Sequence, residues 1–127
     1  MEEYIKSTNI ELSLRELIKI RASQVNGCAY CLSMHTQEAR EAGESNQRID
    51  CVSVWDECEF YTDKEKAALE LTEAITNISI GGVSDALYEK VRKYFDERDY
   101  VDLVYLINLI NSWNRLSIAM KNPPTVR

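Results

Sequence analysis

Apolar residues recur at helical spacing along almost the whole chain of 127 residues, and few residues interrupt them. Only four glycines and two prolines are present. Because glycine and proline break regular structure, their scarcity favours long elements joined by short connections, and it argues against an all-β or a disordered chain. We therefore expect an all-α fold of about six helices, in a single domain that covers residues 1–127.

Capping and breaking signals divide the chain into these helices. The segments 13–16 (SLRE) and 62–65 (TDKE) have the form of capping boxes, in which Ser or Thr and a Glu three residues later satisfy free backbone N–H groups. Breaks are predicted at Gly27, Gly43, Gly81 and Gly82. The expected helices cover about residues 13–26, 28–42, 47–57, 63–78, 84–95 and 99–120. The first eleven residues fit either a loose arm or one short helix.

The last predicted helix, residues 99–120, is apolar around most of its circumference. A helix of this kind is buried on several sides rather than along one stripe. In so small a chain, part of that surface is expected to meet another subunit, which predicts a homo-oligomer.

The charge and the beginning of the chain limit its partners. A net charge of −6 offers no basic surface for nucleic acid or for an anionic membrane. No apolar run is long enough to span a bilayer, and the opening MEEYIKSTNI does not resemble a signal peptide. We expect a cytoplasmic protein. In a reducing compartment, a C-x-x-C pair is more often redox-active or metal-binding than a structural disulfide.

Such a pair lies in the segment 21–44, at the predicted start of a helix. Cys28 and Cys31 have the C-x-x-C spacing, and His35, the only histidine, follows four residues later. The N-terminus of a helix stabilises a thiolate, and cysteines three residues apart in the first turn come close enough for a disulfide. All three side chains fall on one face of the helix, so His35 is placed to exchange a proton with Cys31.

Glu16 lies twelve residues before Cys28, on the preceding predicted helix. If the two helices pack antiparallel, its carboxylate can orient His35 or pass a proton to it. Two plainer interpretations stay open from the sequence alone. Glu16 can be only the partner in a capping box, and His35 can be a structural residue of its helix.

Metal binding is the alternative chemistry. Cys28, Cys31 and His35 could bind zinc, with Cys51 or Cys58 as a fourth ligand. Zinc sites usually pair two short ligand knuckles, however, and the second knuckle is missing here. We therefore expect no bound metal.

The other cysteines and the aromatic residues have plainer predicted roles. Free cysteine is often buried, so Cys51 and Cys58 are expected to be small apolar core residues. Tyr30, Trp55 and Trp113 are expected to pack rather than to form a substrate cage.

The pattern E-x11-C-x-x-C-x3-H, formed by Glu16, Cys28, Cys31 and His35, is much more specific than a lone C-x-x-C. It resembles the motif of the alkyl hydroperoxidase D (AhpD)-like proteins of the carboxymuconolactone decarboxylase superfamily. The resemblance extends over about residues 12–122. It includes AREAGE after the histidine and INLINSWNRLSIAM near the end of the chain.

This resemblance implies an all-helical subunit that forms a homo-oligomer, typically a trimer or a hexamer. It also implies a thiol-dependent peroxidase or disulfide reductase without bound metal or haem. Cys31 would attack a small hydroperoxide, Cys28 would resolve the product as a disulfide, and His35 and Glu16 would relay protons. An external dithiol, such as a lipoyl group or a partner redox protein, would reduce the disulfide.

One residue departs from the family pattern. The best-known members have a histidine between the two cysteines and count it in the relay, whereas this chain has Tyr30. A tyrosine hydroxyl donates a hydrogen bond but is a poor base at neutral pH, so Tyr30 is an accessory candidate only. A thiol–disulfide carrier or sensor without peroxide turnover is therefore the alternative function. Lactone decarboxylation is not expected, because that branch of the superfamily lacks the cysteine pair.

Overall fold

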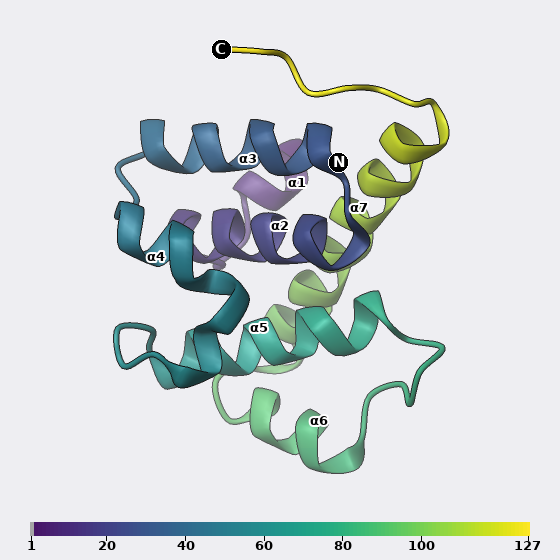
Figure 1. The fold of residues 1–127 in the computed structure, drawn as a ribbon. Helices are drawn as coiled ribbons and strands as arrows, with labels where there is room; N and C mark the ends of the chain where they lie inside the picture. The colour runs from purple at the N-terminus through teal and green to yellow at the C-terminus, as the bar shows by residue number, and fades with distance from the viewer. Residues whose placement is uncertain (1) are drawn as a thin grey trace.

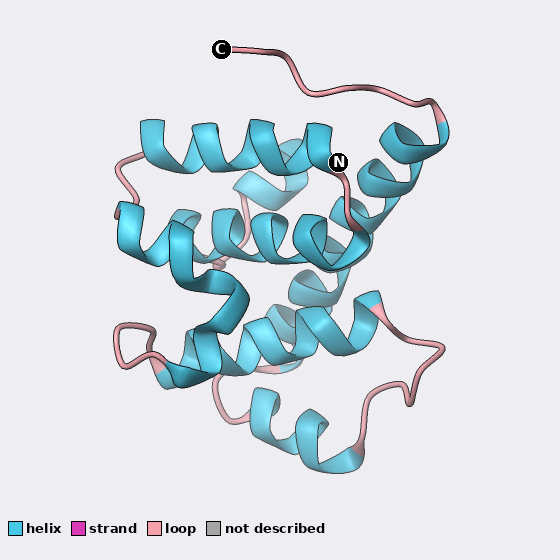
Figure 2. Cartoon of the chain, viewed as in Figure 1, coloured by secondary structure: helices cyan, strands magenta, loops and turns pink. Residues whose placement is uncertain are grey.

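Residues 2–127 are described by a computed structural model, and all regular structure in them is helical (Figure 2). The elements are α1 (Glu2–Lys6), α2 (Leu12–Asn26), α3 (Ala29–Glu41), α4 (Asn46–Cys51), the 3-10 helix η1 (Val52–Glu57), α5 (Asp63–Thr76), α6 (Asp85–Arg92) and α7 (Glu97–Ala119). The all-α prediction is confirmed. In these residues, none of the helices is both long and apolar enough to cross a membrane.

Two segments of the chain show a different division into helices from the one predicted. The opening segment contains a short helix, α1, which raises the count above the predicted six. The helix predicted over residues 47–57 is divided into α4, which ends at Cys51, and η1, which has a kink at Val54 with φ −125° and ψ 33°. The breaks at Gly27 and Gly43 are confirmed, since both residues have positive φ.

The two predicted capping boxes have opposite outcomes. The box at Thr62 is confirmed: the Glu65 N–H donates to Thr62 Oγ1 over 3.1 Å, and the Thr62 N–H donates to Glu65 Oε1 over 2.8 Å. The box at 13–16 is wrong, because α2 begins one residue earlier and Ser13 lies inside it. The Ser13 hydroxyl instead donates to Glu44, just beyond the end of α3.

Helix α2 lies at the centre of the fold and packs against α3, α5 and α7 (Figure 1). Two of its faces contribute to two apolar clusters. Leu14 and Ile18 join a cluster with α5, α6 and α7, whereas Leu17 and Ile20 join a cluster with α3, α4, η1 and α5. Because α2 is covered from several directions, its side chains are held in place and it forms a rigid support for α3.

Candidate active site

The connection between α2 and α3 brings the predicted site residues together. Gly27 ends α2 in the left-handed conformation at φ +71°, and the Cys28 N–H donates to Ser23 O over 3.0 Å. Glycine adopts this conformation without steric cost, and the chain reverses within two residues. Helix α3 therefore runs back along α2, as the sequence-based argument for Glu16 required.

Cys28 is the N-cap residue of α3, and its Sγ accepts a hydrogen bond from the Cys31 N–H over 3.3 Å. Cys28 and Cys31 are joined as a disulfide, with their Cα atoms 5.3 Å apart. Both side chains are almost completely buried. The pair thus lies where the backbone N–H groups and the dipole of α3 favour a negative charge on sulfur.

A cavity of about 250 Å³ opens beside Cys31. It is lined by residues of four helices: Glu2, Lys19, Tyr30, Cys31, Met34, His35, Glu38, Trp113 and Ser117. Cys28 is not among them. The backbone carbonyl of Trp113, on α7, lies 3.9 Å from Cys31 Sγ. Of the two sulfur atoms, that of Cys31 therefore faces the space that a substrate could enter.

Glu16 and His35 meet across the interface between α2 and α3. A carboxylate oxygen of Glu16, a ring nitrogen of His35 and a carboxylate oxygen of Glu38 all lie within 4.8 Å of one another. Glu16 and His35 are only 6% and 7% exposed, and Glu16 Oε2 and His35 Nδ1 are buried without a hydrogen-bond partner. A buried polar atom of this kind normally binds a proton donor, an acceptor or a water molecule. The arrangement is suited to moving a proton.

The surroundings of these two groups shift their ionisation in opposite directions. Burial, together with the charge of Lys19, lowers the pKa of His35 from its usual 6.5 to about 4. Burial raises the pKa of Glu16, and Lys19 opposes that increase. At neutral pH the imidazole is therefore neutral, with one ring nitrogen free to accept a proton.

Comparisons with known proteins identify the family of the chain. The model of the carboxymuconolactone decarboxylase family matches residues 1–74. The chain belongs to this family. Over 122 residues it is 59% identical to the uncharacterized protein YdfG of Bacillus subtilis, which covers 96% of this chain and 83% of that protein. Over 118 residues it is 28% identical to the uncharacterized protein YnjA of Escherichia coli, which covers 93% of this chain and 64% of that protein.

One solved structure links the chain to the AhpD-like members of the family. A crystal structure from Agrobacterium tumefaciens, of a protein of unknown function described as a candidate antioxidant defence protein AhpD, superposes with a TM-score of 0.94 at 38% identity. It covers 99% of this chain and 86% of that one. The debrominase Bmp8, in complex with 2,3,4-tribromopyrrole, has a TM-score of 0.88 at 19% identity, covering 98% and 66% of the two chains. The likeness to Bmp8 concerns the fold alone.

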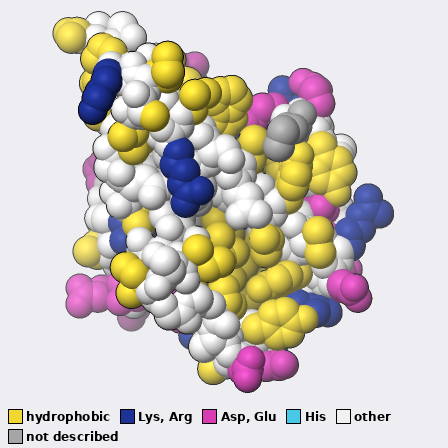
Figure 3. Space-filling view, turned by 90° about the vertical axis from the view of Figure 1, so that its right-hand side faces the viewer, with side chains coloured by type: hydrophobic (Ala, Val, Ile, Leu, Met, Phe, Trp, Pro, Cys, Tyr) yellow, Lys and Arg dark blue, Asp and Glu magenta, His cyan; other side chains and the backbone are white. Residues whose placement is uncertain are grey.

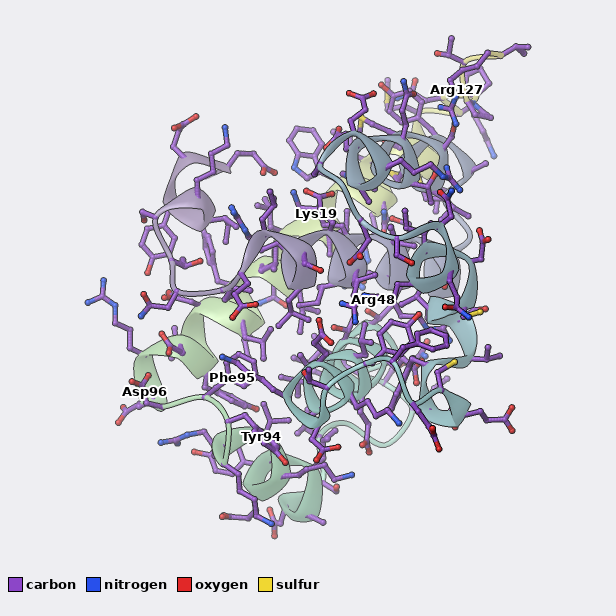
Figure 4. The ribbon with its side chains drawn as sticks, turned by 90° about the vertical axis from the view of Figure 1, so that its left-hand side faces the viewer. Lys19, Arg48, Tyr94, Phe95, Asp96 and Arg127 are labelled. Atoms are coloured by element: carbon purple, nitrogen blue, oxygen red, sulfur yellow. A yellow bond between two sulfur atoms is a disulfide. The ribbon has the colours of Figure 1, made fainter. Side chains whose placement is uncertain are left out.

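Two charged residues of this family member were missed by the sequence analysis. Lys19 Nζ lies 3.8 Å from Glu16 Oε1 and 3.9 Å from Glu2 Oε2. Glu38 Oε2 lies 3.8 Å from His35 Nδ1. Each is three residues after a predicted site residue on the same helix, so helical spacing was a signal that could have found both. Figure 4 labels Lys19 between α2 and α3.

The aromatic residues have mixed outcomes. Trp55 packs as predicted, and its indole N–H donates to Glu73 Oε2 over 2.9 Å. Trp113 is 47% exposed and lines the cavity together with half-buried Tyr30. The prediction that these two only pack is therefore incomplete, because both also form the wall beside Cys31.

The prediction that Cys51 and Cys58 lie in the core is wrong, since both are half-buried free thiols. Cys58 packs at the edge of the cluster that contains Val52 and Trp55 rather than inside it. Nor do they join His35 as zinc ligands. In residues 2–127, the group of possible metal ligands that meets at the site, Glu16, His35 and Glu38, contains no cysteine.

Proposed function

We propose that this chain is a thiol-dependent peroxidase, in which Cys31 reduces a small hydroperoxide and Cys28 resolves the oxidised product. One observation carries the proposal: Cys31 and His35 line the same cavity, and Glu16 approaches His35 from the neighbouring helix. The arrangement supplies a nucleophile, a base and a second proton acceptor, with a resolving thiol one helical turn away from the nucleophile.

In the reduced protein, the Cys31 thiol transfers its proton to neutral His35. The resulting thiolate is stabilised by the N-terminus of α3, and it stabilises the imidazolium in turn because opposite charges offset the cost of burial. The thiolate attacks the outer oxygen of the hydroperoxide and the O–O bond breaks. The alcohol leaves with the proton from His35, and Cys31 becomes a sulfenic acid.

The Cys28 thiol then attacks the sulfur of the sulfenic acid. The S–O bond breaks, water leaves, and the Cys28–Cys31 disulfide forms, which is the state seen in the structure. His35 and Glu16 accept the thiol proton and deliver it to the leaving hydroxide. Each cycle reduces one hydroperoxide by two electrons and oxidises two thiols to one disulfide.

An external dithiol completes the cycle by exchange. Its first thiolate attacks the disulfide, and its second displaces the protein sulfur, so that a new disulfide leaves and both cysteines are reduced. A lipoyl group or a partner redox protein supplies such a dithiol, and no bound cofactor is required. Met34 and the aromatic side chains of Tyr30 and Trp113 give the cavity an apolar wall for the carbon chain of either reactant.

We further propose that the chain works as a homo-oligomer, a trimer or a hexamer, in the cytoplasm. The support comes from α7, which exposes large apolar side chains: Val101, Trp113, Leu116 and Ile118. Figure 3 shows apolar side chains gathered on one face of the molecule. Exposed apolar surface of this kind is typical of a subunit interface. Sedimentation of the purified protein tests this, and a monomer at micromolar concentration would contradict it.

The experiment that tests the catalytic proposal is peroxide consumption driven by a dithiol such as dihydrolipoamide. Cys31→Ser and Cys28→Ser should each stop turnover, whereas Cys58→Ser should not. If both active-site variants keep full activity, the proposal is wrong.

A thiol–disulfide carrier is the second candidate, and Tyr30 is the observation that favours it. Tyr30 lines the cavity beside Cys31 and stands where the best-known family members have the relay histidine. A carrier would form and lose the Cys28–Cys31 disulfide reversibly in exchange with small disulfides, with negligible peroxide turnover. Measuring both rates on the same preparation distinguishes the two functions.

A further inference from the structure

We propose that Lys19 is a positioning residue of this reaction, because its ammonium holds the Glu16 carboxylate ionised and in place to accept the proton from His35. This inference rests on the proposed function and extends it to a residue outside the cysteine–histidine motif. Lys19 does not touch the reacting sulfur. It acts through Glu16.

The position of Lys19 is the first argument. Its side chain is only 13% exposed, and it contributes to the wall of the cavity that Cys31 and His35 line. The ammonium lies between Glu16 on its own helix, at 3.8 Å, and Glu2 on α1, at 3.9 Å. A long, flexible side chain held between two acids keeps its charge at a fixed place.

The charges around the relay are the second argument. The titratable groups that face Glu16 from the packed elements are Glu2 on α1, Arg15 and Lys19 on α2, and His35 and Glu38 on α3. Helix α7 contributes only the uncharged Trp113 and Ser117 to the cavity. Three carboxylates thus converge here: Glu16 is buried, and Glu2 and Glu38 are each about half exposed. Without Lys19, the burial of Glu16 and the repulsion from the other two would favour a protonated Glu16. A protonated carboxyl cannot accept the proton.

Loss of the Lys19 ammonium should change the pKa of Glu16 and the pKa of His35 in the same direction. Lys19 lowers the pKa of Glu16 and that of His35, so its removal raises both. Glu16 would then stay protonated, and His35 would stay charged, up to a higher pH. An opposite charge within about 4–6 Å of a carboxyl lowers its pKa, and Lys19 Nζ lies within that range of Glu16 Oε1.

The first measurement is the pH profile of kcat/KM for peroxide reduction in Lys19→Met and Lys19→Arg. The acidic limb of Lys19→Met should move upward by about one pH unit, which is about a tenfold loss on that limb. Lys19→Arg keeps the charge and should restore the wild-type profile. Lys90→Met is the matched control, because Lys90 is exposed and pairs with Glu70 at 2.8 Å, away from the cavity. An unmoved limb in Lys19→Met would overturn the proposal.

The second measurement does not depend on turnover. NMR titration of the Glu16 carboxyl carbon and of the His35 ring in the disulfide form should give higher pKa values in Lys19→Met than in wild type. Lys19→Gln provides a second neutral variant if the methionine variant folds poorly. Equal Glu16 titration in wild type and a folded neutral variant would refute the role of Lys19. If wild type reduces no peroxide but the Glu16 titration still shifts, the proposed function fails and the electrostatic role of Lys19 stands.

Discussion

The two cysteine pairs of this chain lie in opposite environments. Cys28 and Cys31 are buried at the N-terminus of α3 and form a disulfide beside the cavity. Cys51 is the last residue of α4, and Cys58 follows η1. Both of these are half-buried free thiols, and the Cys58 Sγ donates a hydrogen bond to Val54 O over 3.5 Å.

From this contrast we expect position on a helix, rather than exposure, to decide which cysteines react. The positive end of the α3 dipole lies at Cys28 and Cys31, whereas Cys51 and Cys58 lie at C-terminal ends of helices, where the dipole disfavours a thiolate. Burial and the neighbouring Cys51 also raise the pKa of the Cys58 thiol. The more accessible pair is therefore expected to be the less reactive one.

The largest expected difference between the pairs is in turnover. Cys31→Ser should lower dithiol-driven peroxide consumption by at least about a thousandfold, because the nucleophile is lost. Cys58→Ser should stay within about twofold of wild type, since a half-buried thiol outside the site takes no part. Initial rates under identical conditions give both numbers. Comparable losses in the two variants would abolish the distinction between the pairs.

His35→Asn should slow oxidation of Cys31 by about a hundredfold, which is typical of losing a general base. The reduced protein is mixed with peroxide, and sulfenic acid at Cys31 is trapped in a Cys28→Ser background. Alkylation of Cys58 in the same sample serves as the internal control and should not change. If His35→Asn slowed both cysteines equally, its effect would be structural rather than catalytic.

Reduction of the Cys28–Cys31 disulfide should lower the free energy of unfolding by about 2 kcal/mol, the value expected for closing so short a loop. Urea unfolding with and without a reductant measures the difference. The Cys28→Ser/Cys31→Ser double variant should not respond to the reductant at all. A similar response in that variant would assign the effect to Cys51 and Cys58 instead.

The smallest expected effect is the pH dependence of alkylation at Cys58. Because its pKa is raised, only a small fraction is thiolate near neutral pH, and the rate should rise about tenfold per pH unit until the folded-state pKa is reached. Reduced Cys31 should depend less steeply on pH. Peptide-resolved mass spectrometry follows the alkylation of both cysteines. A Cys58 rate that stops rising near neutral pH would contradict the expected difference between the two cysteine pairs.

The sequence predicted those features of the fold and the site that depend on neighbouring residues. Gly27 and Gly43 end helices because of local backbone conformation, and the Thr62 box forms within one turn. Glu16 and His35 were placed correctly together because a two-residue reversal leaves their helices few ways to pack.

The features that the sequence did not predict depend on distant partners. The box at Ser13 has the same form as the one at Thr62, yet its hydroxyl is engaged by Glu44, thirty-one residues away. Trp113 reaches Cys31 across a separation of 82 residues, which helical periodicity cannot reveal. Lys19 likewise has a partner outside its own helix, Glu2 on α1, at 3.9 Å.

The reversal at Gly27 also has a consequence for the order of folding. One helical hairpin, α2 and α3, carries Glu16, Cys28, Cys31 and His35, so the contacts among them form without closing a long loop. The cavity wall at Trp113 forms only when α7 packs against this hairpin. We expect the hairpin to gain amide protection before α7 in pulsed hydrogen exchange. A newly made chain would then hold its cysteines together before the cavity closes over them, and oxidation to the disulfide could precede the native state.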